Sequence, residues 1–161
     1  MTNNNILRSV RDTFDFSDSK MCVIFGLANL ETTCEQVSDW LKNEGDPAYK
    51  NCTDVQLAIF LNGLINDKRG KKEGPQPEPE TYLTNNIIFL KLKIALDLKA
   101  DDVLDIMNLA NLRINKYELS AFFRKPYHKN YRICKDKVLR SFLEGVQLKY
   151  RDKISDECLK C

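Results

Sequence analysis

The chain has 161 residues, of which 43% are hydrophobic and 30% charged, and its formal net charge is +2. This composition is typical of a soluble protein with one ordinary domain or two small ones. It argues against a membrane protein, because the longest apolar stretches, 57–65 and 87–98, are shorter than the roughly 20 residues that a membrane span needs. The start of the chain lacks the basic and apolar regions of a signal peptide, so we predict a cytoplasmic protein.

The sequence is internally duplicated at a fixed offset of 82 positions. Leu-Ala-Asn-Leu at 27–30 recurs at 109–112, and Phe-Leu-x-Gly at 60–63 recurs at 142–145. The register holds without a gap from residue 3 to residue 69, which predicts two tandem homologous repeats. The predicted organisation is repeat 1 at 1–69, a Pro/Gly/Lys/Glu linker at 70–84, repeat 2 at 85–151 and a polar, loosely ordered tail at 152–161.

The first half of each repeat reads as two helices. Apolar residues recur at helical spacing in the first, and the asparagines at 3–5 and 85–86 are its predicted caps. Ser17 or Asp18 can open the second helix of repeat 1, and Asp101 can open that of repeat 2. Asn29 and Asn111 are placed to end it in a left-handed conformation.

The second half of each repeat also reads as two helices. Thr33 opens the third helix, Asn115 opens its counterpart, and Thr53 caps the last. Gly63 and Gly145 lie within the last helix, where they can allow a close approach of a neighbouring helix. The predicted fold is all-α, with about four helices per repeat. Because so small a unit is marginally stable alone, we expect the repeats to pack as one pseudo-twofold helical bundle.

Several motifs are specific when they are taken together. They are Asn-Asn-Ile-Leu-Arg at 4–8, Phe-Leu-Asn-Gly-Leu-Ile at 60–65, Leu-Ser-Ala-Phe-Phe-Arg at 119–124 and His-Lys-Asn-Tyr-Arg at 128–132. With them the chain resembles a YehS-like bacterial family of unknown function, in which a short helical domain occurs twice. The resemblance covers nearly all of the chain except the tail. It implies a bacterial, cytosolic protein and supplies no activity.

The two repeats differ in charge. Residues 3–69 contain 7 basic and 10 acidic residues, whereas residues 85–151 contain 14 basic and 7 acidic ones. The excess gathers in 124–140, and five of its seven cations have no charged basic counterpart in repeat 1. Cations can hold phosphates and tyrosines can stack on bases, so we predict a binding site for nucleic acid or another polyanion here. This basic segment comprises Arg124, Lys125, Tyr127, His128, Lys129, Tyr131, Arg132, Lys135, Lys137 and Arg140.

Other interpretations of the basic segment stay open. It can be a solvated face that aids solubility, or it can bind an acidic protein partner. A protein-interaction or homodimerising adaptor is the runner-up function, and an enzyme of unrecognised type is third. The second and third helices also resemble a helix-turn-helix motif, in which repeat 2 would present Lys116, Tyr117, Arg124 and Lys125 to DNA. The bulky Phe25 and Met107 in the preceding helices disfavour that motif.

Catalytic and metal chemistry have little support in the sequence. The one histidine, His128, is most simply a polar turn residue, and Asp54 and Asp136 suit helix starts. The six cysteines are predicted to be thiols, with Cys22, Cys52 and Cys134 as small buried hydrophobes. The pair at 158 and 161 has zinc-knuckle spacing without two further ligands. We therefore predict no catalytic residue, no cofactor and no metal site.

Overall fold

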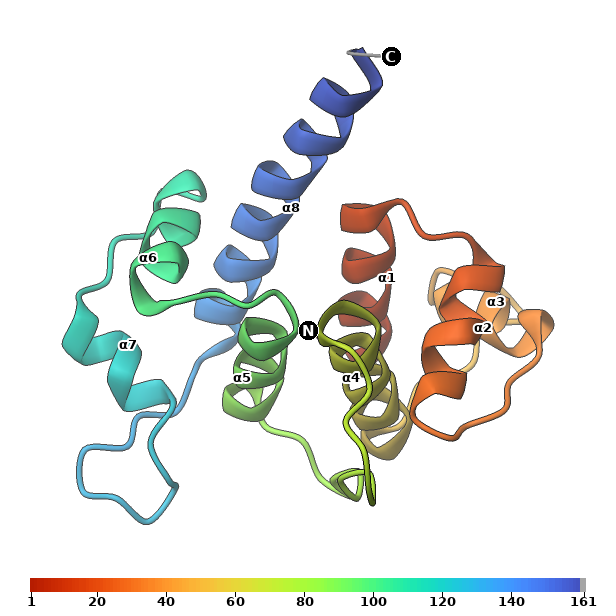
Figure 1. Cartoon of the computed structure of the whole chain (residues 1–161), viewed down its shortest axis with the longest axis horizontal. Helices are drawn as coiled ribbons and strands as arrows, with labels where there is room; N and C mark the ends of the chain where they lie inside the picture. The colour runs from red at the N-terminus through yellow and green to blue at the C-terminus, as the bar shows by residue number, and fades with distance from the viewer. Residues whose placement is uncertain (160–161) are drawn as a thin grey trace. The chain divides into compact units, whose positions relative to one another are not determined.

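The structure is a computed structural model, and it describes the backbone of residues 1–159 and the side chains of residues 1–151. It divides into two compact units, one ending at Leu83 and the other beginning at Thr84. Over the described residues all elements are α-helices, which confirms the all-α class and the two tandem helical repeats. The first unit contains α1 (Asn3–Phe14), α2 (Asp18–Leu27), α3 (Cys34–Leu41) and α4 (Asp54–Arg69) (Figure 1). The second contains α5 (Asn85–Ala95), α6 (Ala100–Leu109), α7 (Lys116–Phe122) and α8 (Asp136–Leu159).

Most helix boundaries lie where the polar residues predict them. Ser17, Thr33, Thr53 and Asn115 each accept a hydrogen bond from the first turn of α2, α3, α4 and α7, respectively. Asn29 and Asn111 have φ angles of 68° and 60°, so both adopt the predicted left-handed conformation after α2 and α6. The pseudo-twofold packing of the two repeats stays a prediction.

Four boundaries differ from the prediction. Thr2 and Thr84, rather than the asparagines that follow them, cap α1 and α5. Helix α6 begins directly after Lys99, whose backbone N–H donates to Asp102 Oδ2 at 2.8 Å, and therefore one residue before Asp101. Helix α8 continues to Leu159, so the described part of the tail has a helical backbone, which the sequence does not predict. The pair at 158 and 161 lies outside the residues whose side chains are described.

Asn4 and Asn86 are buried tethers between segments of the chain and do not cap a helix. Asn4 Nδ2 donates to the backbone oxygens of Trp40 and Lys50, both at 2.8 Å, and Asn4 Oδ1 accepts from the Cys52 N–H at 3.0 Å. These bonds fasten α1 to both ends of the segment that follows α3. Asn86 repeats the pattern with Phe122 O, Arg132 O and the Cys134 N–H, at 2.9, 2.7 and 2.9 Å.

The aromatic centre of the core occupies a different helix in each repeat. In repeat 1 the α2 residue Phe25 lies with its ring centroid 5.2 Å from those of both Trp40 and Phe60. In repeat 2 the α5 residue Phe89 takes this place, with its ring 4.5 Å from that of Phe142. The counterpart of Phe25 is Met107. The counterpart of Phe89 is Leu7, so the large ring moves from one helix to another and an apolar side chain replaces it at each place, an exchange that packed interiors tolerate.

Gly63 and Gly145 have the predicted role. Helix α4 packs chiefly against α2, and α8 packs chiefly against α6. A Cβ added at Gly63 would lie 2.8 Å from the carbonyl carbon of Ile24, and one at Gly145 would lie 2.9 Å from that of Ile106. The carbonyl oxygens would be closer still. Glycine is thus what lets the backbone of each last helix touch the backbone of the second.

The linker packs on repeat 1. The side chain of Asn66 in α4 donates to Leu27 O at 2.9 Å and to Gln76 Oε1 at 3.0 Å. The Leu83 N–H donates to Asp54 Oδ2 at 2.9 Å, and the Leu83 side chain is buried. The proline-containing segment therefore has fixed contacts with the unit that precedes it.

Cys52 and Cys134 are buried as predicted, and burial raises the pKa of both thiols from 9.0 to about 12. At pH 8 the folded protein should hold roughly 1000-fold less thiolate at these positions than an unfolded chain, because three pKa units separate the two states. We expect iodoacetamide to label Cys34 quickly and these two only when the chain unfolds. The folded state binds more protons than the unfolded state above pH 9, so its stability should fall as the pH rises towards 12. Labelling of both buried thiols at the rate of Cys34 in native protein would contradict this expectation.

Candidate functional site

The first part of the basic segment lies on the loop 123–135 between α7 and α8, which extends as a wide loop in Figure 1. Backbone hydrogen bonds give the loop a defined course. The His128 N–H donates to Lys125 O and the Tyr131 N–H donates to His128 O, both at 2.9 Å. The Arg132 N–H then donates to Ala121 O in α7 at 3.1 Å. Together with the Asn86 tether, these bonds fix the backbone of the loop that carries the cations beside α7.

His128 completes one of these turns. Its Nδ1 accepts the Asn130 N–H at 3.0 Å, as Asp46 Oδ1 accepts the Ala48 N–H at 2.9 Å in repeat 1. The imidazole of His128 therefore accepts the backbone hydrogen bond that a carboxylate accepts in the same turn of repeat 1. Because Nδ1 is an acceptor, the neutral ring carries its proton on Nε2, which lies 3.5 Å from Arg124 Nη1. This geometry agrees with the interpretation of His128 as a polar turn residue.

The cations of the basic segment face solvent. All seven, at 124, 125, 129, 132, 135, 137 and 140, have exposed side chains. Arg132 has an ion pair with Glu118 at 3.8 Å, in which Arg132 is exposed and Glu118 is half-buried, and so long a pair at the surface contributes little to stability. Arg140 interacts electrostatically with Asp136 and helps to lower the pKa of that carboxyl, but the side chains of all seven cations remain exposed to solvent. Their charges are therefore available to an external anion.

Arg124, Lys129 and Arg132 converge on one hollow of about 520 Å³ between α7 and the loop. Tyr131 from the basic segment lines it as well, as does Tyr117, which is 88% exposed at the start of α7. Cations and aromatic rings thus share one concave surface, the combination that phosphate contacts and base stacking require. The other members of the predicted set do not line this hollow: Lys125, Tyr127, His128, Lys135, Lys137 and Arg140.

Arg124 also lines a second, smaller hollow of about 310 Å³. Lys93 of α5 and Lys116 of α7 line it together with Arg124, over an apolar floor that includes Phe123. Lys93 Nζ is 5.6 Å from the centroid of the Phe123 ring, and Lys116 pairs with the exposed Asp101 at 3.0 Å. Since Arg124 belongs to both hollows, the cationic surface continues from the loop across the end of α7.

The same region of repeat 1 is built differently. Lys42, the counterpart of Arg124, pairs with Asp39 at 2.8 Å, and this carboxylate raises the pKa of Lys42. In repeat 2 the position of Asp39 is occupied by Ala121, which leaves Arg124 without that partner. The fold is thus compatible with a cation at this position that is paired with a carboxylate, as in repeat 1. In repeat 2 the cation at this position lacks that carboxylate.

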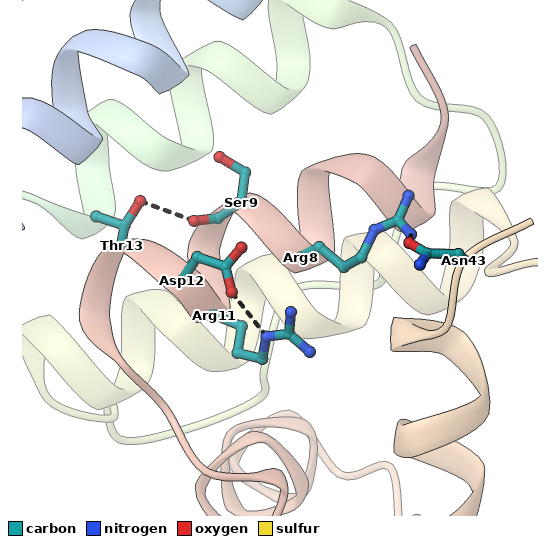
Figure 2. Close-up of polar contacts among 6 residues, drawn as sticks. All are labelled: Arg8, Ser9, Arg11, Asp12, Thr13 and Asn43. Carbon is teal, nitrogen blue, oxygen red and sulfur yellow. Dashed lines mark hydrogen bonds and ion pairs between the residues drawn. The ribbon is translucent and has the colours of Figure 1, made fainter.

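The start of the loop is also held differently in the two repeats. In repeat 1 Arg8 Nη1 donates to Asn43 Oδ1 at 3.1 Å (Figure 2). It also donates to Lys42 O at 3.1 Å, and the two bonds tie α1 to the residues after α3. The Arg8 side chain also bonds to Asn5 on its own helix. Other polar contacts of α1 in Figure 2, such as Thr13 Oγ1 to Ser9 O at 2.7 Å, stay within the helix. The counterpart of Arg8 is Leu90, so repeat 2 lacks this clamp at its basic loop.

Comparison with known proteins supports the duplication. A family model described as "Protein of unknown function (DUF1456)" matches the chain twice, over residues 3–70 and 85–152. The chain belongs to this family. The "Uncharacterized protein YehS" of Escherichia coli (strain K12) is 44% identical over 147 residues, which cover 91% of this chain and 94% of the relative. The resemblance to a YehS-like family with a repeated helical domain is therefore confirmed, whereas no solved structure shows a significant match.

The DUF1456 comparison supplies no activity, so the chemistry has to come from the residues. The sequence predicts Lys116 and Tyr117 as contacts only for a helix-turn-helix, predicts Asn115 only as a helix start, and does not predict Lys93 or Asn130 as site residues. Lys93 lies 31 positions before Arg124 in the sequence, and only the packing of α5 beside α7 brings the two to one hollow. Counting charges along a stretch of the sequence cannot identify such a residue, because it lies far from the basic segment in the sequence.

The remaining candidates in this DUF1456 chain have structural partners. Asp54 and Asp136 accept from Asn3 and Asn85, each at 2.7 Å, and this hydrogen bond lowers the pKa of Asp136. Asp136 and His128 line neither hollow. In the described part of the chain, His, Cys, Asp and Glu form no group of three or more that could hold a metal ion. No helix there combines the length and the apolar composition of a membrane span.

Proposed function

We propose that the protein is a non-enzymatic binding module whose repeat 2 holds nucleic acid through the basic segment. The observation that carries this proposal is the set of seven exposed cations in one segment, of which Arg132 pairs with Glu118 and Arg140 interacts electrostatically with Asp136. Lysine and arginine that lack internal partners release counterions when they meet phosphates, which is the main source of affinity for nucleic acid.

Aromatic side chains support nucleic acid over a simple anion. Tyr117 and Tyr127 are 88% and 87% exposed, and Tyr131 lines the larger hollow beside Arg132. Their counterparts in repeat 1 are Glu35, Gly45 and Tyr49, so two of the three rings are particular to repeat 2. Stacking of a base on an exposed ring contributes about 1–3 kcal/mol, and it favours single strands, whose bases are accessible.

The proposal predicts salt-dependent binding that charge reversal abolishes. We expect the purified protein to raise the fluorescence anisotropy of labelled single-stranded RNA or DNA at low salt, with an affinity that falls as salt rises. Arg132→Glu combined with Lys135→Glu should weaken binding roughly 10- to 100-fold, because two phosphate contacts become repulsive.

A matched control comes from the linker. Lys71→Glu with Lys72→Glu changes the net charge by the same amount at two exposed positions outside the basic segment. This control should lower the affinity by less than about threefold, since its charges lie away from the contacts. The proposal fails if the wild-type protein binds no strand at low salt, or if the two double variants lose affinity equally.

An exposed apolar side chain favours a second candidate, an acidic protein partner. Ile133 is 74% exposed between Arg132 and the buried Cys134, and its counterpart in repeat 1 is Asn51. A protein interface would bury this apolar side chain, whereas it would contribute nothing to the binding of phosphates. Ile133→Ser should therefore leave nucleic-acid affinity within about twofold if the first candidate holds. A large loss of affinity would instead favour a contact surface that includes apolar burial.

A further inference from the structure

Cys22 and Cys34 lie close enough for a bond to form between them. Their Sγ atoms are 3.5 Å apart, whereas the sulfurs of a disulfide are about 2.05 Å apart. Cys22 lies in the middle of α2, and Cys34 is the first residue of α3. The left-handed Asn29 and the Leu30 N–H bond to Phe25 O at 3.1 Å reverse the chain between the two helices. This turn brings together two thiols that are twelve positions apart in the sequence.

The two thiols have different surroundings. Cys34 is exposed, and Cys22 is half-buried, in contrast to the fully buried Cys52 and Cys134. Burial raises the pKa of the Cys22 thiol, and the neighbouring Cys34 thiol raises it further. Cys34 is therefore the thiol that a dissolved oxidant meets first, and Cys22 is the thiol placed to react second. The prediction that Cys22 is a small buried hydrophobe like Cys52 is wrong in this respect.

The pair is particular to repeat 1. The corresponding residues of repeat 2 are Leu104 and Lys116, although the same turn joins α6 to α7. A leucine and a lysine thus serve the fold at these positions. Burial of a small apolar group therefore gives no account of why both positions in repeat 1 hold sulfur.

We propose that Cys22 and Cys34 are a modification site at which a hydroperoxide forms a reversible intramolecular disulfide. The Cys34 thiolate attacks one oxygen of the peroxide, the O–O bond breaks, and the product is a sulfenic acid. The leaving group, hydroxide from hydrogen peroxide or alkoxide from an organic hydroperoxide, takes up the proton released from Cys34 and departs as water or as an alcohol. The sulfur of Cys22 then attacks the Cys34 sulfur, the S–O bond breaks, and the departing hydroxide leaves as water with the Cys22 proton. Two electrons pass from the two thiols to the peroxide, and a dithiol reductant reverses the change.

The bond would join α2 to the start of α3 within one repeat. Closing the short loop between them restricts the unfolded chain, so oxidation should raise the melting temperature of repeat 1 by about 5–10 °C. The basic segment lies in repeat 2, so this inference is independent of the proposed function. A failure to bind nucleic acid would leave it untouched.

The test is a peptide map of the full chain. Reduced protein is treated with equimolar hydrogen peroxide, alkylated with iodoacetamide and digested with trypsin under non-reducing conditions. Both cysteines lie in the tryptic peptide 21–42, and the proposal expects this peptide to lose two hydrogens and to escape alkylation. Further cleavage after Glu31 should leave its halves joined until dithiothreitol is added.

Two variants and an unfolded control complete the design. Cys34→Ser changes an exposed position and should abolish both the mass change and the rise in melting temperature. Cys22→Ser should leave a sulfenic acid on Cys34 that dimedone traps. In urea the selective pairing should disappear, because the proximity depends on the fold. The proposal is overturned if both thiols of peptide 21–42 remain alkylatable after oxidation of the folded protein, or if Cys34 pairs with a different cysteine.

Discussion

We expect Gly63→Ala to lower the free energy of unfolding of repeat 1 by about 2–4 kcal/mol, even though alanine is the better helix former by about 1 kcal/mol. The added Cβ would lie 2.8 Å from the carbonyl carbon of Ile24, and a carbonyl in the middle of α2 cannot rotate away. Helices α2 and α4 would have to separate, and the packing of Phe25 on Phe60 would loosen. Urea denaturation followed by circular dichroism measures the change.

Gly26→Ala is the matched control for this effect. Gly26 also lies in a helix of repeat 1, but a methyl group added there meets no atom within 4 Å. It should leave stability unchanged or raise it by up to about 1 kcal/mol. Gly145→Ala repeats the experiment in repeat 2, where the added group would lie 2.9 Å from the carbonyl carbon of Ile106. Equal stabilities of the Gly63 and Gly26 variants would show that α2 and α4 do not touch at the glycine.

The duplication explains why so much of the fold is predictable from this sequence. Each helix is read twice, so a feature such as the left-handed asparagine at 29 and 111 or the glycine at 63 and 145 appears as a repeated choice rather than a coincidence. Repetition shows that a residue is needed without showing what it contacts. The duplication accordingly pairs Asn4 with Asn86, but the sequence predicts that both cap helices. Their actual partners lie 36 to 48 positions away in the sequence, and rules for helix caps, which use only neighbouring residues, cannot predict them.

The candidate site is predictable to a smaller extent. The contrast in charge between the repeats identifies Arg124, Lys129 and Arg132, which do converge on one hollow. It cannot separate them from Lys137 or Arg140, which follow in sequence but line neither hollow, because helix α8 carries them away from the loop. Convergence on a concave surface is a property of tertiary packing, and linear charge density contains no information about it.

We expect Asn86→Ala to lower the free energy of unfolding of repeat 2 by about 3–5 kcal/mol, because it leaves three backbone groups without their partner. These groups are the carbonyls of Phe122 and Arg132 and the N–H of Cys134, all of which bond to the Asn86 side chain within 2.9 Å. Asn86→Asp should be nearly as costly, since a carboxylate cannot donate to the two carbonyls. Chemical denaturation gives the size of the loss, and hydrogen exchange locates it in repeat 2.

Asn4→Ala makes the same lesion in repeat 1, where Asn4 holds the carbonyls of Trp40 and Lys50 and the N–H of Cys52. The two variants should therefore lose similar stability. A difference between them in nucleic-acid binding would then come from the loop of repeat 2 and not from the loss of stability. At a temperature where both remain folded, Asn86→Ala should weaken nucleic-acid binding about tenfold, because the tether no longer holds Arg132 in place beside α7. Asn4→Ala should bind like the wild type. If the two variants lose affinity equally, the loop of repeat 2 is not the contact surface, and the unshared cations serve the solubility of repeat 2 instead.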